Sequence, residues 1–152
     1  MPKDSMPALP HYPQSSDGAC LPACARMVLA TLGHNHTETE LAQAMGSYSF
    51  GTPSSHITRL QRLGYQVLYA TATLDELRRY LAAGHFPIVF VAADFLPWAD
   101  FSGFHALVLV TVSDIEVSVM DPSLASGPTP MTIDAFLLTW EEFDSRMAVI
   151  TE

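Results

Sequence analysis

The two halves of the sequence carry different hydrophobic patterns, and this contrast restricts the fold more than any other feature. Up to about residue 84, apolar residues recur mostly at helical spacing, between capping residues and terminating glycines. Beyond that point they form short runs rich in valine and isoleucine, which are typical of strands. Helices first and strands later indicate an α+β fold with an antiparallel sheet.

The individual elements follow from the same signals. Two capping boxes, Thr37 with Glu40 and Thr73 with Glu76, predict two helix starts. Helices are predicted over 20–32, 38–45, from Pro53 to a stop at Gly64, over 74–83 and over 133–140. Strands are predicted over 65–70, 87–93, 105–112, 116–121 and 146–151.

The length of 152 residues fits one domain. Residues 1–13 contain several prolines and are predicted to be an extended lead-in, so that 14–152 form a single domain. We find no apolar run long enough for a signal peptide or a membrane span. This favours the cytoplasm, where thiols stay reduced.

The charge balance argues against one class of partner. The net charge is −9, with only seven Lys and Arg residues. Such a surface repels phosphate backbones, so we expect no binding of nucleic acid.

Cys20 lies where a turn containing Asp17 and Gly18 runs into a predicted helix. Free amide groups and the positive end of the helix dipole favour a thiolate there, which is the form that a nucleophilic cysteine needs. Cys24 lies one turn further along the helix and is predicted to belong to the core. The alternative is that both cysteines are small buried hydrophobic residues.

His105 and Asp121 lie at the far ends of two neighbouring strand-like runs. If these runs form a hairpin centred near Ser113, His105 lies directly opposite Asp121, and Leu109 lies opposite Val117. Opposed residues point to the same face of a sheet, so the carboxylate could fix the orientation of the imidazole. The alternative is an aspartate that only caps the strand end before Pro122.

A further alternative is that Cys20 and Cys24 bind a metal ion together with His34 and His36. The helix between them separates Cys20 from the histidines by roughly 18 Å, at 1.5 Å per residue. One ion cannot bridge that distance, so we expect no metal and no other cofactor.

Several segments of the sequence follow one another in a recognisable order. They are residues 14–29, QSSDGACLPACARMVL, then Gly51-Thr52, Leu63-Gly64, residues 83–89, AGHFPIV, and finally His105 and Asp121-Pro122. In these segments and their order the sequence resembles the bacteriocin-processing, double-glycine leader peptidases, which are papain-like cysteine peptidases.

The resemblance implies roles for four residues. Cys20 becomes the nucleophile, His105 the general base and acid, and Asp121 the residue that orients the imidazole. Gln14 becomes a side-chain donor of the oxyanion hole. The family usually has glycine after the cysteine, where this chain has Leu21, so we expect Leu21 to lie in the path of the substrate.

Aromatic residues just before His105 are candidates for a substrate-binding wall, or for a loop that simply packs on the core. We name Trp98 and Phe104 as candidate substrate-binding residues. The predicted function is hydrolysis of a peptide bond in a peptide or protein. The alternatives are a catalytically silent peptide-binding domain of the same fold, and acyl transfer or amide hydrolysis with the same triad.

Overall fold

The computed structural model describes residues 8–152. Its helices are α1 (Cys20–Thr31), α2 (Glu38–Met45), α3 (Leu74–Ala82) and α4 (Ile133–Glu141), with two 3-10 helices, Ser54–Leu63 and Ala93–Phe95. The strands are β1 (Gln66–Thr71), β2 (Ile88–Ala92), β3 (Phe104–Val112), β4 (Glu116–Met120), β5 (Thr129–Thr132) and β6 (Arg146–Thr151).

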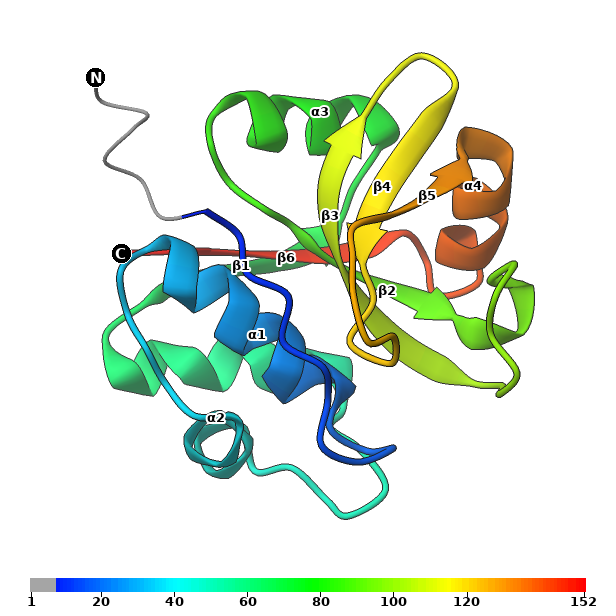
Figure 1. Ribbon diagram of the computed structural model, residues 1–152. Coiled ribbons are helices and arrows are strands. Elements are labelled where there is room, and N and C mark those ends of the chain that lie inside the picture. Colours follow the sequence, from blue (N-terminus) through cyan, green and yellow to red (C-terminus); the bar gives the residue numbers. More distant parts are fainter. Residues whose placement is uncertain (1–7) are drawn as a thin grey trace.

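The strands form one antiparallel sheet in the order β1-β6-β2-β3-β4-β5. Figure 1 shows α1 and α2 on one side of this sheet and α3 and α4 on the other. The predicted α+β architecture, with a helical first half packed on an antiparallel sheet, is therefore confirmed. Of the predicted lead-in over residues 1–13, the first seven lie outside the described residues, and residues 8–13 form neither helix nor strand.

Each face of the sheet has its own core, and β3 contributes to both because its side chains alternate. Ala106 and Val108 belong to the core under α1, α2 and the 3-10 helix Ser54–Leu63. Leu107 and Leu109 belong to the core under α3 and α4. The central strands are thus buried on both sides, which makes the sheet a rigid support for residues at the ends of β3 and β4.

Most helix boundaries agree with the sequence signals. Both predicted capping boxes are present, at Thr37 with Glu40 and at Thr73 with Glu76. Gly46 ends α2 with a φ of 65°, a left-handed conformation that glycine adopts without strain. The third predicted helix is a 3-10 helix rather than an α-helix. Strand β5 was not predicted, because the short segment TPMT contains a proline and lacks a strand pattern.

The predicted register of the β3–β4 hairpin is wrong. Leu109 pairs with Val119, not with Val117, and continuing this register places Leu107 opposite Asp121. The hydroxyl of Ser113 accepts hydrogen bonds from the backbone N–H groups of the two residues that follow Asp114, so the turn comes after Ser113 instead of centring on it. A β-bulge between Leu109 and Thr111 changes the register by one residue within the hairpin. Near Asp121 the observed register differs from the predicted one by two residues. Because side chains alternate along a strand, Asp121 and His105 still point to the same face of the sheet.

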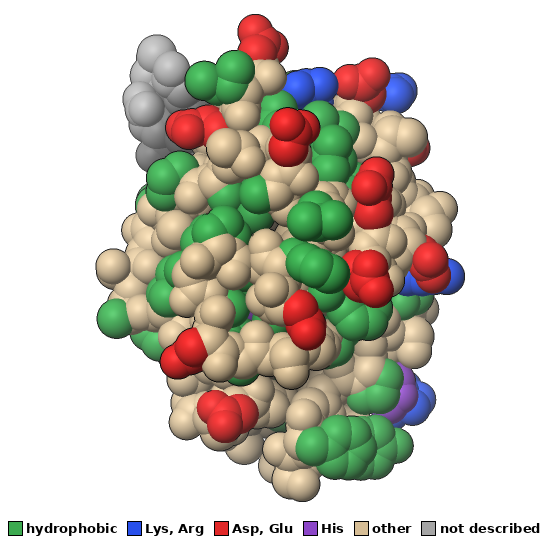
Figure 2. Space-filling view, turned by 90° about the vertical axis from the view of Figure 1, so that its right-hand side faces the viewer, with side chains coloured by type: hydrophobic (Ala, Val, Ile, Leu, Met, Phe, Trp, Pro, Cys, Tyr) green, Lys and Arg blue, Asp and Glu red, His purple; other side chains and the backbone are tan. Residues whose placement is uncertain are grey.

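The surface reflects the net negative charge. Figure 2 shows acidic side chains scattered over one face of the molecule, with Lys and Arg at only a few places. Among the helices of residues 8–152, none has the length and apolar character that crossing a bilayer requires.

Candidate active site

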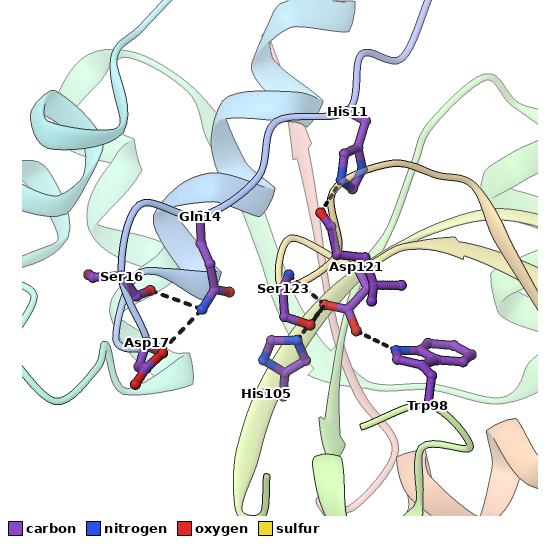
Figure 3. Close-up of polar contacts among 9 residues, drawn as sticks. His11, Gln14, Ser16, Asp17, Trp98, His105, Asp121 and Ser123 are labelled. Atoms are coloured by element: carbon purple, nitrogen blue, oxygen red, sulfur yellow. Dashed lines mark hydrogen bonds and ion pairs between the residues drawn. The ribbon is translucent and has the colours of Figure 1, made fainter. Parts of the chain in front are cut away.

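His105 and Asp121 form a buried, hydrogen-bonded pair where β3 begins and β4 has just ended. Nε2 of His105 lies 2.7 Å from Oδ1 of Asp121 (Figure 3). The side chains are 2% and 0% exposed, respectively. Because Nε2 is directed at the carboxylate, Nδ1 is the nitrogen left for a second partner.

Asp121 receives further hydrogen bonds that fix its carboxylate. Its Oδ1 also accepts from the backbone N–H and the hydroxyl of Ser123, at 2.8 and 2.7 Å. Its Oδ2 accepts from Nε1 of Trp98 at 2.8 Å. Figure 3 shows these donors approaching the carboxylate from three sides. Four donors to one buried carboxylate favour its ionised form.

The pKa values of the pair follow from this arrangement. Burial tends to lower the pKa of His105, but the hydrogen bond to Asp121 and the side chain of Cys20 raise it from 6.5 to about 9. Burial tends to raise the pKa of Asp121, but the hydrogen bond and charge of His105, together with Trp98 and Ser123, lower it. The favoured state at neutral pH is an imidazolium paired with a carboxylate.

Cys20 is the first residue of α1, and the residue before it, Ala19, offers no side-chain cap. Pro22 has no N–H and that of Ala23 is bonded to the carbonyl oxygen of Ala19, so the N–H groups of Cys20 and Leu21 are those that the first turn offers to a negative charge. Cys20 is only 4% exposed, and its side chain raises the pKa of His105. The structure thus places the start of α1 near enough to the His105–Asp121 pair for Cys20 to affect the pKa of the imidazole.

Cys24 lies one turn further along α1 and is fully buried, as predicted for a core residue. Burial raises the pKa of its thiol, and the negative charges of Cys20 and Asp121 raise it further. Both cysteines are free thiols. Cys24 therefore favours the protonated thiol, which is the less reactive form.

Gln14 lies next to the site, but its side-chain amide is occupied. Nε2 donates to the carbonyl oxygen of Ser16 at 2.9 Å and, more weakly, to that of Asp17 at 3.4 Å (Figure 3). Its Oε1 is buried and has no hydrogen-bond partner among the described residues. An oxyanion could use this amide only after it releases the carbonyl groups of its own loop.

The loop that carries Gln14 packs closely against a second loop. A Cβ atom added to Gly18 would lie 2.6 Å from the carbonyl oxygen of Ser49, so only glycine fits there. This contact brings Phe50 to the mouth of the site, where its side chain is 82% exposed.

A cavity of about 900 Å³ opens beside these residues. Gln14, His105, Trp98 and Phe104 are among the residues that line it. Its remaining wall is formed by Ser15, Ser16, Asp17, Phe50, Ala99, Asp100, Phe101, Ser102, Ser123 and Leu124. No lysine or arginine is among these residues.

The expectation that Leu21 lies in the path of the substrate is wrong. Its side chain is 0% exposed and belongs to the core between α1 and the sheet. The first turn of α1 directs Leu21 inward, so this residue neither crowds nor contacts the cavity.

The histidines considered for a metal site have other partners. His34 contacts Glu152, and Nε2 of His36 lies 2.7 Å from the hydroxyl of Tyr65. Among residues 8–152, no group of three or more His, Cys, Asp or Glu side chains is arranged to hold a metal ion.

Two residues of the site were not predicted in their observed roles. Ser123 was missed, although an aspartate followed two residues later by serine is a known turn pattern in which the carboxylate accepts from the backbone. Trp98 was predicted as a substrate contact, and its hydrogen bond to Asp121 joins positions 23 residues apart. No local sequence pattern signals such a contact.

Several solved structures share this fold. A putative C39-like peptidase from Bacillus anthracis has a TM-score of 0.77 at 15% identity, covering 95% of this chain and 94% of that one. The peptidase domain of Streptococcus ComA, a bifunctional ABC transporter of a quorum-sensing pathway, has a TM-score of 0.76 at 19% identity, covering 95% and 98%. A double glycine motif protease from an AMS/PCAT transporter, in complex with the leader peptide, has a TM-score of 0.73 at 14% identity, covering 96% and 93%.

These similarities confirm the predicted fold, which is that of C39 peptidases and their papain-like architecture. No curated protein matches the sequence. The model of the Peptidase_C39 like family matches residues 7–147, which is nearly the whole chain. The protein belongs to the Peptidase_C39 like family.

Proposed function

We propose that this protein is a cysteine peptidase in which Cys20 is the nucleophile, His105 the general base and acid, and Asp121 the residue that orients His105. The observation that carries the proposal is the buried His105–Asp121 pair, 2.7 Å between Nε2 and Oδ1, beside a thiol at the start of α1. A buried imidazolium next to a thiol stabilises the thiolate, which is the reactive form.

The proposed reaction proceeds in two stages. The Cys20 thiolate attacks the carbonyl carbon of the peptide bond, and the electrons move onto the carbonyl oxygen. His105 then donates its proton to the leaving amine as the C–N bond breaks, which leaves a thioester on Cys20. Water, deprotonated by His105, then attacks the thioester carbon, and the C–S bond breaks to release the carboxylic acid. Cys20 leaves as the thiolate beside His105, which holds the proton from water, so the ion pair is restored.

The oxyanion that forms in both stages needs donors. The backbone N–H of Cys20 lies in the first turn of α1, where helix amides have no partner within the helix. Gln14 supplies the second donor in this proposal, once its amide turns away from the carbonyl groups of Ser16 and Asp17.

We propose a peptide or protein as the substrate, bound along the cavity with Trp98 and Phe104 in its wall. The structurally similar protease that was solved with a leader peptide supports this class of substrate. We also propose that residues 14–152 act as a single domain, and that it works in the cytoplasm, where its nucleophile stays reduced.

The second candidate function is peptide binding without catalysis. Two observations favour it: the amide of Gln14 is occupied by its own loop, and Cys20 is only 4% exposed. The two candidates share the cavity and differ in whether Cys20 forms a bond to the substrate.

A peptide library incubated with the protein and read by mass spectrometry distinguishes the candidates. Cleavage that is lost in Cys20→Ala and retained in Cys24→Ala supports the peptidase, because the two variants remove the same group one helical turn apart. If the wild-type protein binds peptides of the library but cleaves none of them, it is instead the catalytically silent peptide-binding domain.

A further inference from the structure

The two oxygens of the Asp121 carboxylate are unequally bonded. Oδ1 accepts three hydrogen bonds, one from His105 and two from Ser123. Oδ2 accepts one, from Nε1 of Trp98 at 2.8 Å. Since Asp121 is fully buried, the indole N–H is the one donor among the described residues that holds this second oxygen.

Trp98 belongs to the segment between β2 and β3, and the ends of this segment are tied together. The backbone N–H of Ala93 donates to the carbonyl oxygen of Gly103, and the N–H of Gly103 donates to Oδ1 of Asp94, both at 2.8 Å. Trp98 also packs against the core under α3 and α4. The tied loop and the packing on the core therefore hold the indole in place independently of its hydrogen bond to Asp121.

The same segment also contacts the histidine. The ring of Phe101 meets that of His105 edge to face, with 5.0 Å between the ring centroids. Trp98 and Phe101 thus touch the carboxylate and the imidazole, respectively, from one tied loop.

A buried carboxylate with one oxygen unbonded is poorly satisfied and can rotate toward other donors. Rotation would carry Oδ1 out of line with Nε2 of His105. We propose that Trp98 is a positioning residue of the site, whose indole N–H fixes Asp121 in the orientation in which its other oxygen accepts from His105. This inference rests on the proposed function, since it assigns Trp98 a role in the same reaction.

The pKa of Asp121 also supports a positioning role for Trp98. The hydrogen bond from Trp98 lowers the pKa of Asp121, which keeps the carboxylate ionised and able to support the imidazolium. From the facing helix α1, the side chain of Cys20 raises the pKa of His105, and the charge of Asp121 raises the pKa of Cys24. Cys24 is fully buried with a raised pKa, so alkylation of Cys20 is the suitable readout.

The test measures the rate at which iodoacetamide alkylates Cys20, as a function of pH. Trp98→Phe removes the N–H donor and keeps an aromatic ring. Trp140→Phe is the matched control, because Nε1 of Trp140 also donates one hydrogen bond at 2.8 Å, but to the backbone oxygen of Arg146, in the core under α3 and α4. We expect Trp98→Phe to move the midpoint of the pH profile up by about one unit, the size of one lost hydrogen bond to a carboxylate.

Trp140→Phe should lower the melting temperature and leave this midpoint where it is. An unchanged midpoint in Trp98→Phe, or equal shifts in the two variants, would overturn the positioning role. If Trp98→Phe does not fold, β-(3-benzothienyl)alanine in place of Trp98 keeps the bicyclic ring and removes only the N–H, with the same shift expected. Failure of the proposed function looks different, because the wild-type Cys20 would then react like a free thiol.

Discussion

Gln14 donates its backbone N–H to the carbonyl oxygen of Pro122 at 2.7 Å, which joins the segment before the nucleophile to the residue after Asp121. A second hydrogen bond joins the same two segments, from Nε2 of His11 to the carbonyl oxygen of Leu124, at 2.8 Å. The segment leading into α1 is therefore fastened to the turn that presents the carboxylate. The positions of Gln14 and Asp121 are coupled through the backbone, whichever way the side chain of Gln14 points.

Replacing Gln14 by alanine tests the proposed oxyanion donor. Loss of one such donor typically slows turnover by about 10²–10³-fold. The backbone bond to Pro122 remains in Gln14→Ala, so the loop should keep its place. Gln61→Ala, a change of the same type at an exposed position of the 3-10 helix Ser54–Leu63, is the control and should leave kcat unchanged. A Gln14→Ala enzyme with wild-type kcat would exclude this residue from the reaction.

The His105–Asp121 pair predicts how stability depends on pH. The folded-state pKa of His105 is raised from 6.5 to about 9, so its contribution is fully present below pH 6.5 and is lost as the pH rises through 9. The pKa of Asp121 is lowered from 3.8, so its contribution is present above that value and is lost at lower pH. We therefore expect the highest stability between these limits.

Urea midpoints measured in a series of buffers check this pH dependence. His105→Gln should flatten the decline in stability on the alkaline side, because the variant has no imidazolium to lose. His85→Gln, which changes a histidine away from the site, should preserve the decline. A wild-type midpoint that stays constant from pH 6.5 to 9 would mean that His105 is not held as an imidazolium.

Leu21 should affect stability and not substrate binding. Its side chain is completely buried in the core beneath α1, so Leu21→Ala is expected to cost about 2–5 kcal/mol of unfolding free energy. KM for a cleaved peptide should stay close to the wild-type value, since Leu21 does not line the cavity. A large change in KM with little loss of stability would show that the side chain reaches the substrate after all.

Much of the fold could be predicted because local signals determine it. The capping residues Thr37 and Thr73 mark helix starts that the structure confirms, and the valine-rich runs mark β2 to β4. The register of β3 and β4 could not be predicted in the same way. It depends on how the hydroxyl of Ser113 folds the turn and on a bulge near Leu109, and neither leaves a clear mark in the hydrophobic pattern.

The candidate site likewise has features that the sequence could predict and others that it could not. Cys20, His105 and Asp121 were predicted from their positions together with the resemblance to a known family, and the structure shows the hydrogen bond between His105 and Asp121. The sequence could not reveal that Trp98 donates to Asp121, because that contact exists only once two distant loops have packed. The inward direction of Leu21 follows from the packing of the first turn of α1 on the sheet, which a position next to the cysteine does not specify.

The most direct test of the central claim is the rate of Cys20 alkylation at about pH 6 in the wild-type protein and in His105→Ala. A free thiol has a pKa near 8.5 and reacts slowly at that pH. If the imidazolium of His105 stabilises the thiolate, wild-type Cys20 reacts at least about tenfold faster than a free thiol, and His105→Ala loses the difference. Equal, slow rates in both proteins would contradict an ion-paired nucleophile and with it the proposed peptidase.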